Sequence, residues 1–333
     1  MQLSILDVLP VTSQHDAGLA LRSALDLAKL GDRLGFTRLW YAEHHSMASI
    51  ASTSPELLIA HTGSATQHIR LGAGGVMLPN HVPLRVIEQY RTLAALHPGR
   101  VDLGIGRAAG TDPLTARALR SGDGNSFPQL MQELLAFSRQ SFPSSHPYSH
   151  IRVIPEGIAL PPIWMLGSSG GSAEMAGKLG SGYAFAGHFS PVPPAAATHT
   201  YRRSFRPSAK FPKPRVILAV HALCGETDAA AKELAIPVLY SLSLLQRGRS
   251  VVVKTPAEVL AEGWIPSPGN IGPMGQLLIV GDPQRVRVAI ERAAAEASAD
   301  EVMVMTLSHD PALRLRSYEL LAEAFSLPAR ECN

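Results

Sequence analysis

The sequence predicts an α/β protein built as a parallel barrel of eight βα units. Eight short apolar runs alternate with segments of helical periodicity along the 333 residues, as expected of buried strands covered by helices. Glycines and polar residues directly follow several of these runs, and barrels build their functional loops at that end of the strands. A hydrophobic content of 46% is enough to form the core. We therefore expect a single (β/α)8 domain of the TIM type over residues 1–333.

Four strands are expected in the first third of the chain. Each is a short apolar run that stops at a proline, a glycine or a polar residue, as buried strands usually do. These strands are residues 3–9, 38–43, 70–77 and 101–106.

Helices are expected between these strands because their start and stop signals are present. Alanine and leucine recur at helical spacing from Ala24 to Leu34, and Gly35 ends the pattern as a C-cap would. Ser54 and Pro55 open the next helix with an N-cap and a first-turn proline. Two more helices are expected, one from Pro83 and one at about 128–139.

The second part of the chain continues the alternation with two interruptions. Segments 140–160 and 242–276 show little periodicity and contain several prolines, so we expect both to be loop insertions on the barrel. A short apolar run and a helix start at Asp282-Pro283 follow the second insertion. The remaining strands are expected at about 163–167, 183–187, 216–222 and 302–307.

Composition narrows the class of protein. The formal net charge is only +3, and the Lys and Arg residues are scattered rather than clustered, which argues against nucleic-acid binding. Two cysteines give no disulfide framework, and neither a signal peptide nor an apolar run of membrane-spanning length is evident. We expect a cytoplasmic protein that does not bind membranes.

A catalytic metal is not expected, although the chain has 13 histidines. Metal sites on barrels favour His-x-His on a strand or H-E-x-x-H on a helix, and neither spacing occurs. His44 and His45 are adjacent, so on an extended strand their side chains would point to opposite faces. His146 and His150 are separated by a segment that contains Pro147.

Two features at the strand ends have both a structural and a functional interpretation. His44 follows the second strand and would reach the carboxyl face of a barrel, where an imidazole can exchange a proton. By itself, such a histidine more often holds a loop in place. Gly72, Gly74 and Gly75 crowd the third strand, which indicates a bulge or a ligand close to the backbone.

An anion site is expected where the fourth and fifth strands end. Arg107 follows the fourth strand, and its guanidinium forms strong charge-assisted bonds with phosphate. Glu88 on the preceding helix is expected to orient it. A loop of small residues, 167–171, leads into a helix at about 172–179, whose first-turn amides favour an anion. The loop is not a P-loop because no Gly-Lys-Ser/Thr follows it.

Four sequence blocks together resemble the bacterial luciferase-like flavin monooxygenases. They are WYAEHH at 40–45, LGAGGVMLPNH at 71–81, GRVDLGIGRAAGTDP at 99–113 and WMLGSSGGSAEMAGKLG at 164–180. The resemblance implies that His44 is a catalytic base beside the flavin ring, and that a non-proline cis peptide at Gly74-Gly75 lies against that ring. It also implies that the FMN phosphate binds to the following residues: Arg107, Ser168, Ser169, Gly170 and Gly171.

The substrate pocket is less specified by this resemblance. We expect Tyr41, His188 and Phe189 to line it. Gly187 stands where the family often has a second histidine, and Gly106 stands where the luciferase branch has a reactive cysteine. The substrate class is therefore left open between aldehydes and other small organic molecules.

The resemblance implies a monooxygenase that uses reduced FMN and dioxygen. No G-x-G-x-x-G nucleotide fold is evident, so a separate flavin reductase is expected to supply the reduced flavin. Residues 242–276 are the expected cover over the pocket. Two alternatives remain, a hydride-transfer enzyme that uses the deazaflavin F420 and a flavin-binding protein without catalysis.

A homodimer is also expected. Barrels of this family commonly pair through helices beside the second and third strands. The helix from Pro55 carries Leu57, Leu58 and Ile59, which is more apolar surface than one core-facing stripe needs.

Overall fold

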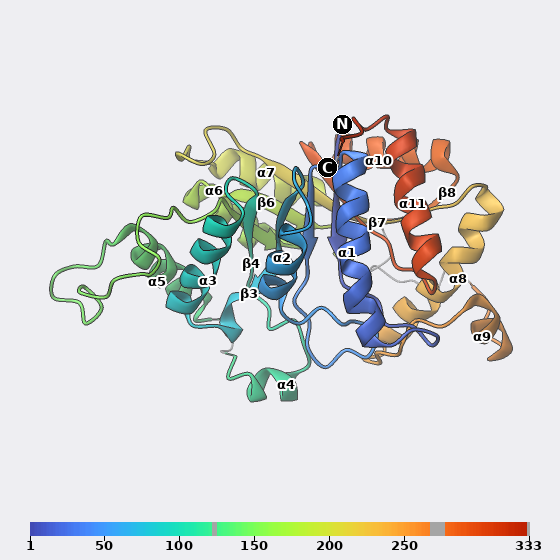
Figure 1. The fold of residues 1–333 in the computed structure, drawn as a ribbon, viewed down its shortest axis with the longest axis horizontal. Coiled ribbons are helices and arrows are strands. Elements are labelled where there is room, and N and C mark those ends of the chain that lie inside the picture. Colours follow the sequence, from blue (N-terminus) through green and yellow to red (C-terminus); the bar gives the residue numbers. More distant parts are fainter. Residues whose placement is uncertain (122–124, 267–276, 332–333) are drawn as a thin grey trace.

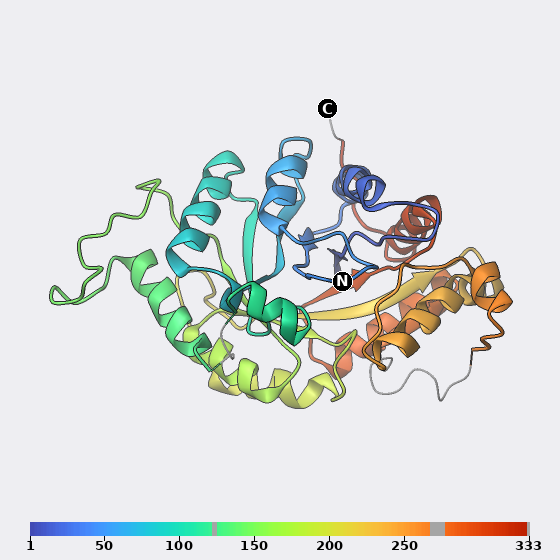
Figure 2. The ribbon, with the colours of Figure 1, turned by 90° about the horizontal axis from the view of Figure 1, so that it is seen from below.

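Eight parallel strands close into a barrel in the computed structural model, which describes residues 1–121, 125–266 and 277–331 (Figures 1 and 2). Neighbouring strands pair in chain order from β1 to β7, and β9 pairs with both β7 and β1, which completes the ring. The predicted barrel is therefore confirmed. Its strands are β1 (Gln2–Asp7), β2 (Arg38–Tyr41), β3 (Arg70–Met77), β4 (Val101–Gly106), β5 (Ile163–Gly167), β6 (Gly182–Ala186), β7 (Val216–Cys224) and β9 (Glu301–Met305).

Helices cover the outside of this ring, as Figure 2 shows. Most begin with a proline in the first turn, and several have an aspartate or threonine N-cap, in agreement with the signals in the sequence. The helices are α1 (Ala17–Leu34), α2 (Pro55–Gly63), α3 (Pro83–Leu96), α4 (Pro113–Ala118), α5 (Phe127–Arg139), α6 (Gly170–Leu179), α7 (Pro194–Ser204), α8 (Asp228–Leu245), α9 (Pro256–Ala261), α10 (Pro283–Glu296) and α11 (Pro311–Ala324), with a short 3-10 turn, η1 (Leu78–Asn80).

A ninth strand, β8 (Leu278–Gly281), extends one wall of the barrel. It pairs with His221–Cys224 of β7, above the point where β6 ends. His221 also pairs with Met305 of β9, so β8 lies along the other edge of β7. Nearer the amino end of β7, this same edge pairs with β6. The wall at β7 therefore reaches further towards the carboxyl face than its neighbours do.

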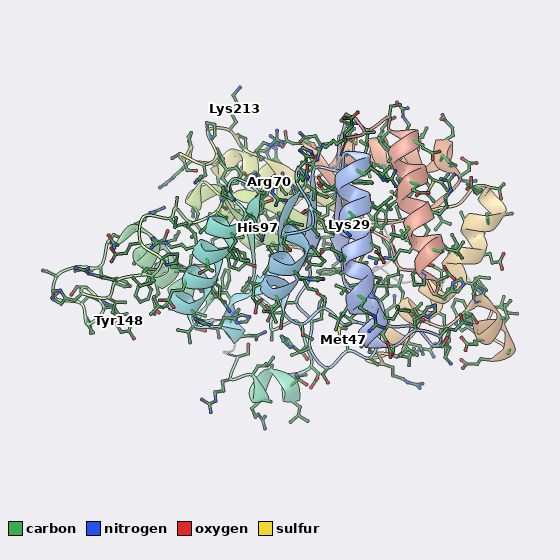
Figure 3. The ribbon with its side chains drawn as sticks, in the orientation of Figure 1. Lys29, Met47, Arg70, His97, Tyr148 and Lys213 are labelled. Carbon is green, nitrogen blue, oxygen red and sulfur yellow. The ribbon has the colours of Figure 1, made fainter. Side chains whose placement is uncertain are left out.

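The two expected insertions differ in structure. Residues 140–160 contain no helix or strand and form an arm beside α5, on which Figure 3 labels Tyr148. The second insertion is not only a loop, because α8 continues to Leu245 and α9 lies within it. A capping box at Thr255 begins α9. Much of its last part, residues 267–276, lies outside the described residues, so the expected cover remains a prediction.

Two tryptophans fill the middle of the barrel. Trp40 and Trp164 pack edge to face with ring centroids 5.7 Å apart. A Cβ atom at Gly72 would come within 2.6 Å of Trp40, and one at Gly182 within 2.3 Å of Trp164. At Gly72 the glycine is therefore required by packing, and no ligand needs to be invoked for it.

A buried charge cluster closes the amino end of the barrel. The Arg38 guanidinium lies 2.7 and 2.9 Å from the two carboxylate oxygens of Glu301 and 2.6 Å from Asp102. All three residues are at most 5% exposed. Asp102 also accepts hydrogen bonds from the Trp40 indole at 3.2 Å and from Arg70. Burial would lower the pKa of Arg38, but the two carboxylates raise it above its ordinary value, so the cluster is held in its charged form.

Replacing Arg38 by methionine should destabilise the fold strongly. The change leaves two carboxylates buried without their partner, so the free energy of unfolding should fall by about 3 to 5 kcal/mol in urea denaturation. The matched control is Arg292→Met, because Arg292 forms an exposed pair with Glu296 at 3.7 Å, and its loss should cost less than about 1 kcal/mol. Equal effects of the two substitutions would contradict a stabilising role of the cluster.

The helix α2 offers less apolar surface than the sequence indicated. Leu57 is 67% exposed, but Leu58 and Ile59 are 7% and 0% exposed because they face the barrel core. The surplus apolar surface used to predict a dimer therefore reduces to Leu57 on this helix. A homodimer remains a proposal.

Candidate functional site

Three histidines reach the carboxyl end of the barrel on its inner side. Strand residues alternate between the two faces of a sheet. On β2, Trp40 and Ala42 belong to the inner cluster, and His44 continues that alternation. His188 follows Ala184 in the same way after β6, and His221 follows Ala219 on β7. This alternation brings all three histidines to the same end of the barrel interior, where charge on His44 or His221 would lower the pKa of His188.

His44 is held by the loop that follows β4. Its Nδ1 lies 3.1 Å from the carbonyl oxygen of Gly110, which also accepts a hydrogen bond from the backbone N–H of His45 at 3.2 Å. Since a carbonyl only accepts, the neutral ring carries its proton on Nδ1 and keeps a lone pair on Nε2. Burial lowers the pKa of His44, and the opposing effects of Gly110 and Glu43 do not compensate for it. His44 is therefore neutral, and its Nε2 accepts no hydrogen bond from the other residues that the structure describes.

Gly110 can accept both bonds only because it is a glycine. Its φ angle is +67°, and a Cβ atom there would lie 2.7 Å from the carbonyl oxygen of Glu43. The glycine lets the loop after β4 pack directly on the end of β2.

Glu43 anchors the loops around His44. This carboxylate is 1% exposed and accepts hydrogen bonds from the Met77 backbone at 2.8 Å, Asn80 Nδ2 at 3.0 Å, His81 Nε2 at 2.9 Å and His45 Nε2 at 3.0 Å. Burial alone would raise the pKa of Glu43, but these hydrogen bonds hold it below its ordinary value. In turn, Glu43 raises the pKa of His81 against the effect of burial.

The Glu43 network connects three strand ends. Asn80 follows β3 and donates both to Glu43 and to the carbonyl oxygen of Ala109 at 3.0 Å. Ala109 precedes Gly110, the acceptor for His44. The carboxylate of Glu43 therefore fixes the ends of β2, β3 and β4 relative to one another and, through them, the orientation of His44.

The peptide bond between Gly74 and Gly75 is cis, as predicted. The register between β3 and β4 shifts between Ala73 and Val76, so a bulge lies at this point. A Cβ atom at Gly74 would meet Leu6 at 2.8 Å, and one at Gly75 would meet the carbonyl oxygen of Gly104 at 2.9 Å. Both glycines are therefore required by close packing across the barrel wall.

The two halves of the expected phosphate site end side by side. Ile105 of β4 pairs with Met165 of β5, and continuing this register places Arg107 level with Gly167. Arg107 is exposed and forms no hydrogen bond or ion pair with the other residues that the structure describes. Glu88, which was expected to orient Arg107, instead lies 3.9 Å from Arg85. That expectation was wrong.

The loop before α6 leaves its helix amides uncapped. Ser169 is the N-cap residue of α6, but its side chain makes no capping hydrogen bond. A Cβ atom at Gly170 or Gly171 would have nothing within 4 Å. The loop itself is anchored from behind, because Tyr183 donates to the carbonyl oxygen of Ser169 at 3.2 Å, and Ser190 donates to that of Ser168 at 3.2 Å. This leaves an open cradle of backbone N–H groups beside Arg107.

His221 was missed by the sequence analysis. It is 1% exposed, and its Nε2 accepts a hydrogen bond from the backbone N–H of Leu307 at 3.3 Å. Its Nδ1 is buried and has no hydrogen-bond partner in the part of the chain that the structure describes. Burial lowers its pKa to about 4. The signal was present in the run VILAVHALC, where a histidine follows alternate apolar residues towards the carboxyl end of a strand.

His188 has a similar environment. Burial, together with the neighbouring His221 and His44, lowers the pKa of His188 to about 3. Its Nδ1 is also buried without a protein partner. At neutral pH the inner wall therefore presents three uncharged imidazoles.

Two of the expected pocket residues lie elsewhere. Tyr41 is fully buried on the outer side of β2, where its hydroxyl donates to Thr62 of α2 at 3.2 Å. It faces away from the barrel interior because it alternates with Trp40, so its assignment to the pocket is corrected. Phe189 is 44% exposed and lies at the rim, with its ring 4.7 Å from that of His188.

Within residues 1–121, 125–266 and 277–331, no three or more histidine, cysteine, aspartate or glutamate side chains converge as metal ligands would. Among the same residues, no helix combines the length and apolar character that crossing a membrane requires.

Replacing His221 by phenylalanine should weaken the acid sensitivity of the fold. An unfolded histidine titrates near about pH 6.5, whereas folded His221 titrates at about 4. The stabilising contribution of the neutral ring is complete above the unfolded pKa and is lost as the pH falls towards the folded pKa.

Urea denaturation at pH 7 and pH 5 measures this effect. Between these two pH values the wild type should lose about 2 kcal/mol more stability than His221→Phe, since one pKa unit corresponds to about 1.4 kcal/mol. Identical losses in both proteins would show that His221 is not held neutral by the fold.

Sequence comparison identifies relatives along most of the chain. The family model described as luciferase-like monooxygenase matches residues 1–301. A luciferase-like monooxygenase of Escherichia coli K12 is 38% identical over 321 residues, which is 95% of each chain. The crystal structure of apo-MsnO8 is 37% identical, with a TM-score of 0.89 over 99% of this chain and 98% of that one.

More distant structures share the fold. The oxygenating constituent of 3,6-diketocamphane monooxygenase from Pseudomonas putida, solved in complex with FMN, is 20% identical with a TM-score of 0.71 over 99% of this chain and 100% of that one. An F420-dependent secondary alcohol dehydrogenase is 15% identical with a TM-score of 0.67 over 99% of each chain. Given the family match and the 38% identity of the E. coli relative, the chain belongs to the luciferase-like monooxygenase family.

Proposed function

We propose that this protein is an FMN-dependent monooxygenase that oxygenates a small organic substrate with dioxygen. The observation that carries the proposal is the state of His44, a neutral imidazole at the carboxyl face of the barrel with its Nδ1 proton directed to Gly110 and its Nε2 free. Such a group accepts a proton at neutral pH without first having to lose one.

The residues beside β4 and β5 fit the phosphate of FMN. The Gly170 and Gly171 amides begin a helix whose N-terminus favours an anion, and no side chain caps them. Arg107 adds an exposed guanidinium level with Gly167. We propose that Arg107 and residues Ser168 to Gly171 hold this phosphate together.

We propose that the flavin ring lies between the Gly74-Gly75 bond and the histidine wall, the part of the barrel lined by His188 and His221. This position is one strand away from the phosphate site along the barrel, and a phosphate and a ring of one molecule would span that separation. Reduced FMN would supply the electrons that activate dioxygen. His44 would accept or return a proton at Nε2, and the network of Glu43 would keep that atom in place.

His188 and His221 would form the opposite wall, where the substrate enters. Because both rings are neutral at pH 7, this wall carries no positive charge. A pocket of this kind suits an uncharged organic molecule and excludes water better than a charged wall would.

A separate enzyme is proposed to reduce the flavin. No G-x-G-x-x-G sequence is present to bind NAD(P)H in the usual way. F420-dependent hydride transfer is the alternative activity, since a solved structure with the same fold uses that cofactor. A flavin-binding protein without catalysis is the other alternative, and the His44 variant described below tests it.

We also retain a homodimer and a cytoplasmic location as proposals. The dimer rests on the exposed apolar side chains Leu57 of α2 and Val82 and Leu96 at the two ends of α3, which are 67%, 65% and 61% exposed. These two helices contact one another, so both flank the same side of the barrel.

Arg107→Ala should weaken FMN binding while leaving riboflavin binding unchanged, because riboflavin lacks the phosphate. The loss of charge-assisted hydrogen bonds should raise the dissociation constant for FMN by roughly 10- to 150-fold in a fluorescence titration. Arg85→Ala removes another arginine, whose side chain is 71% exposed, and should leave both constants unchanged. If Arg107→Ala binds FMN as tightly as the wild type, the phosphate assignment fails.

His44→Ala should lose oxygen transfer and keep FMN. A general base contributes about 10² to 10⁴ in rate, so product formation from an aldehyde panel should fall by that range, and the yield of hydrogen peroxide should rise. Stopped-flow mixing of bound reduced FMN with oxygen, together with a product assay, measures both. The control is His199→Ala on the exposed surface of α7. Unchanged product and peroxide yields in His44→Ala would return His44 to a purely structural role.

A further inference from the structure

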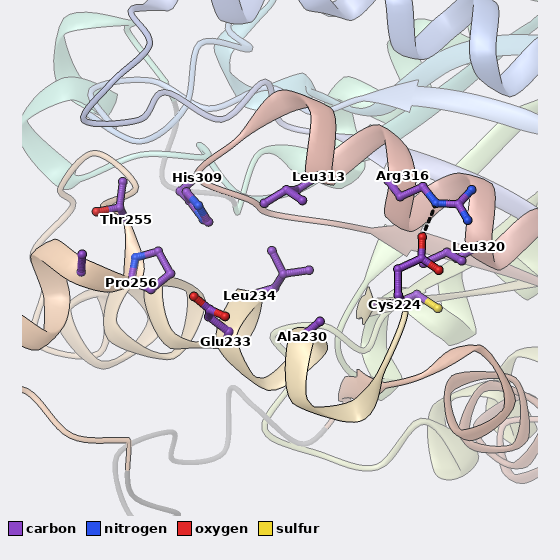
Figure 4. Close-up of a pocket in the computed structure, with 13 residues that line it drawn as sticks. Cys224, Ala230, Glu233, Leu234, Thr255, Pro256, His309, Leu313, Arg316 and Leu320 are labelled. Atoms are coloured by element: carbon purple, nitrogen blue, oxygen red, sulfur yellow. Dashed lines mark hydrogen bonds and ion pairs between the residues drawn. The ribbon is translucent and has the colours of Figure 1, made fainter.

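A second pocket lies outside the barrel, away from the histidine site. It has a volume of about 310 Å³ and lies between α8, the start of α9 and α11 (Figure 4). This volume is at the lower end of ligand sites, so it limits a ligand to a small molecule. None of the residues assigned above to flavin, substrate or proton transfer lines it.

The floor of the pocket is apolar. Leu234 and Ala230 contribute from α8, and Leu313 and Leu320 contribute from α11. Burying an alkyl chain against such side chains is favourable in proportion to the apolar area removed from water. The floor therefore selects a ligand with a hydrocarbon part.

The rim of the pocket is acidic. Among the described residues that line the pocket, Arg316 is the only lysine or arginine, and it is already paired with Glu226 at 2.7 Å, Glu319 at 3.0 Å and Glu323 at 3.1 Å. Glu233 also lines the pocket, and it forms no ion pair or hydrogen bond with the rest of the described chain. The Arg316 guanidinium is thus already shared by three carboxylates, and the carboxylate of Glu233, on the other side of the pocket, is left for a ligand.

The side chain of His309 does not neutralise the negative charge of Glu233. Figure 4 shows its ring and the Glu233 carboxylate facing one another across the pocket, with Leu234 and Leu313 beside them. Burial lowers the pKa of His309, although Asp310 and Glu233 oppose that effect, so the ring is neutral at pH 7. Its Nδ1 has no protein partner.

We propose that this pocket binds a small organic ammonium ion, with its hydrocarbon chain on the leucine floor and its charged nitrogen donating a hydrogen bond to Glu233. An anion would be repelled by the Glu233 carboxylate, and a neutral alcohol would lose the attraction to it. The inference uses no property of the flavin site, so it stands or fails independently of the proposed monooxygenase activity.

Three probes with one chain and different head groups test the proposal on the whole protein. Hexylammonium, hexan-1-ol and hexanoate are titrated at pH 7, and their dissociation constants are measured by NMR chemical-shift changes of the Leu234 and Leu313 methyl groups. Hexylammonium should bind about fivefold more tightly than hexan-1-ol, because an ion pair at a partly exposed carboxylate contributes a factor of about this size. Hexanoate should bind most weakly.

Two variants and one control locate the effect. Glu233→Gln should reduce the preference for hexylammonium over hexan-1-ol to about one, while Glu296→Gln, which removes the same charge from an exposed position on α10, should leave it unchanged. Ala230→Leu should fill the floor and abolish the binding of all three probes. The proposal is overturned if the three probes bind equally, if selectivity survives Glu233→Gln, or if the shift changes occur at the histidine wall.

Discussion

Arg38 bonds two carboxylates from opposite sides of the barrel, and this contact constrains what lies above it. Asp102 stands on β4 and Glu301 on β9, so the guanidinium on β2 joins strands that are not neighbours. Arg38, Asp102 and Glu301 are deeply buried, and their charges compensate one another only while the barrel stays closed. The two tryptophans rest on this cluster, with the Arg38 guanidinium 4.9 Å from the Trp164 ring centroid. Because side chains alternate between the two faces of a strand, the inward positions of β2, β4 and β9 continue from this cluster towards the carboxyl end.

That alternation explains how one barrel presents both a proton acceptor and an anion cradle. The inner positions lead to His44, His188 and His221, all of which burial keeps uncharged. The residues that we propose for the phosphate, Arg107 and Ser168 to Gly171, lie outside this wall, and most of them are exposed to solvent. A base works best when neutral in a dry environment, whereas an anion site needs unpaired donors. Because the two regions are separate, the same chain can satisfy both requirements. The hydrogen bonds of Glu43 connect the ends of β2, β3 and β4 and so set the orientation of His44.

The sequence predicted the features that depend on local pattern. Apolar runs and caps predicted the barrel strands and helices, and paired glycines in a luciferase-like block predicted the cis bond at Gly74-Gly75. Features set by tertiary contacts were less accessible. Tyr41 was expected in the pocket, but it alternates with Trp40, and this one residue of register turns it outward against Thr62. Leu57, Leu58 and Ile59 were expected to exceed what one core-facing stripe needs, whereas α2 buries all of them except Leu57. His221 was overlooked because its run is apolar throughout, so its inward position only follows once the barrel fixes the face of β7.

A crystal structure of the protein soaked with FMN would locate the flavin ring and the phosphate at once. We expect the phosphate within hydrogen-bond distance of Arg107 and of the Gly170 and Gly171 amides, with the ring against Gly74-Gly75 and one edge near His44 Nε2. A phosphate bound at any other strand end, with Arg107 still in solvent, would contradict it.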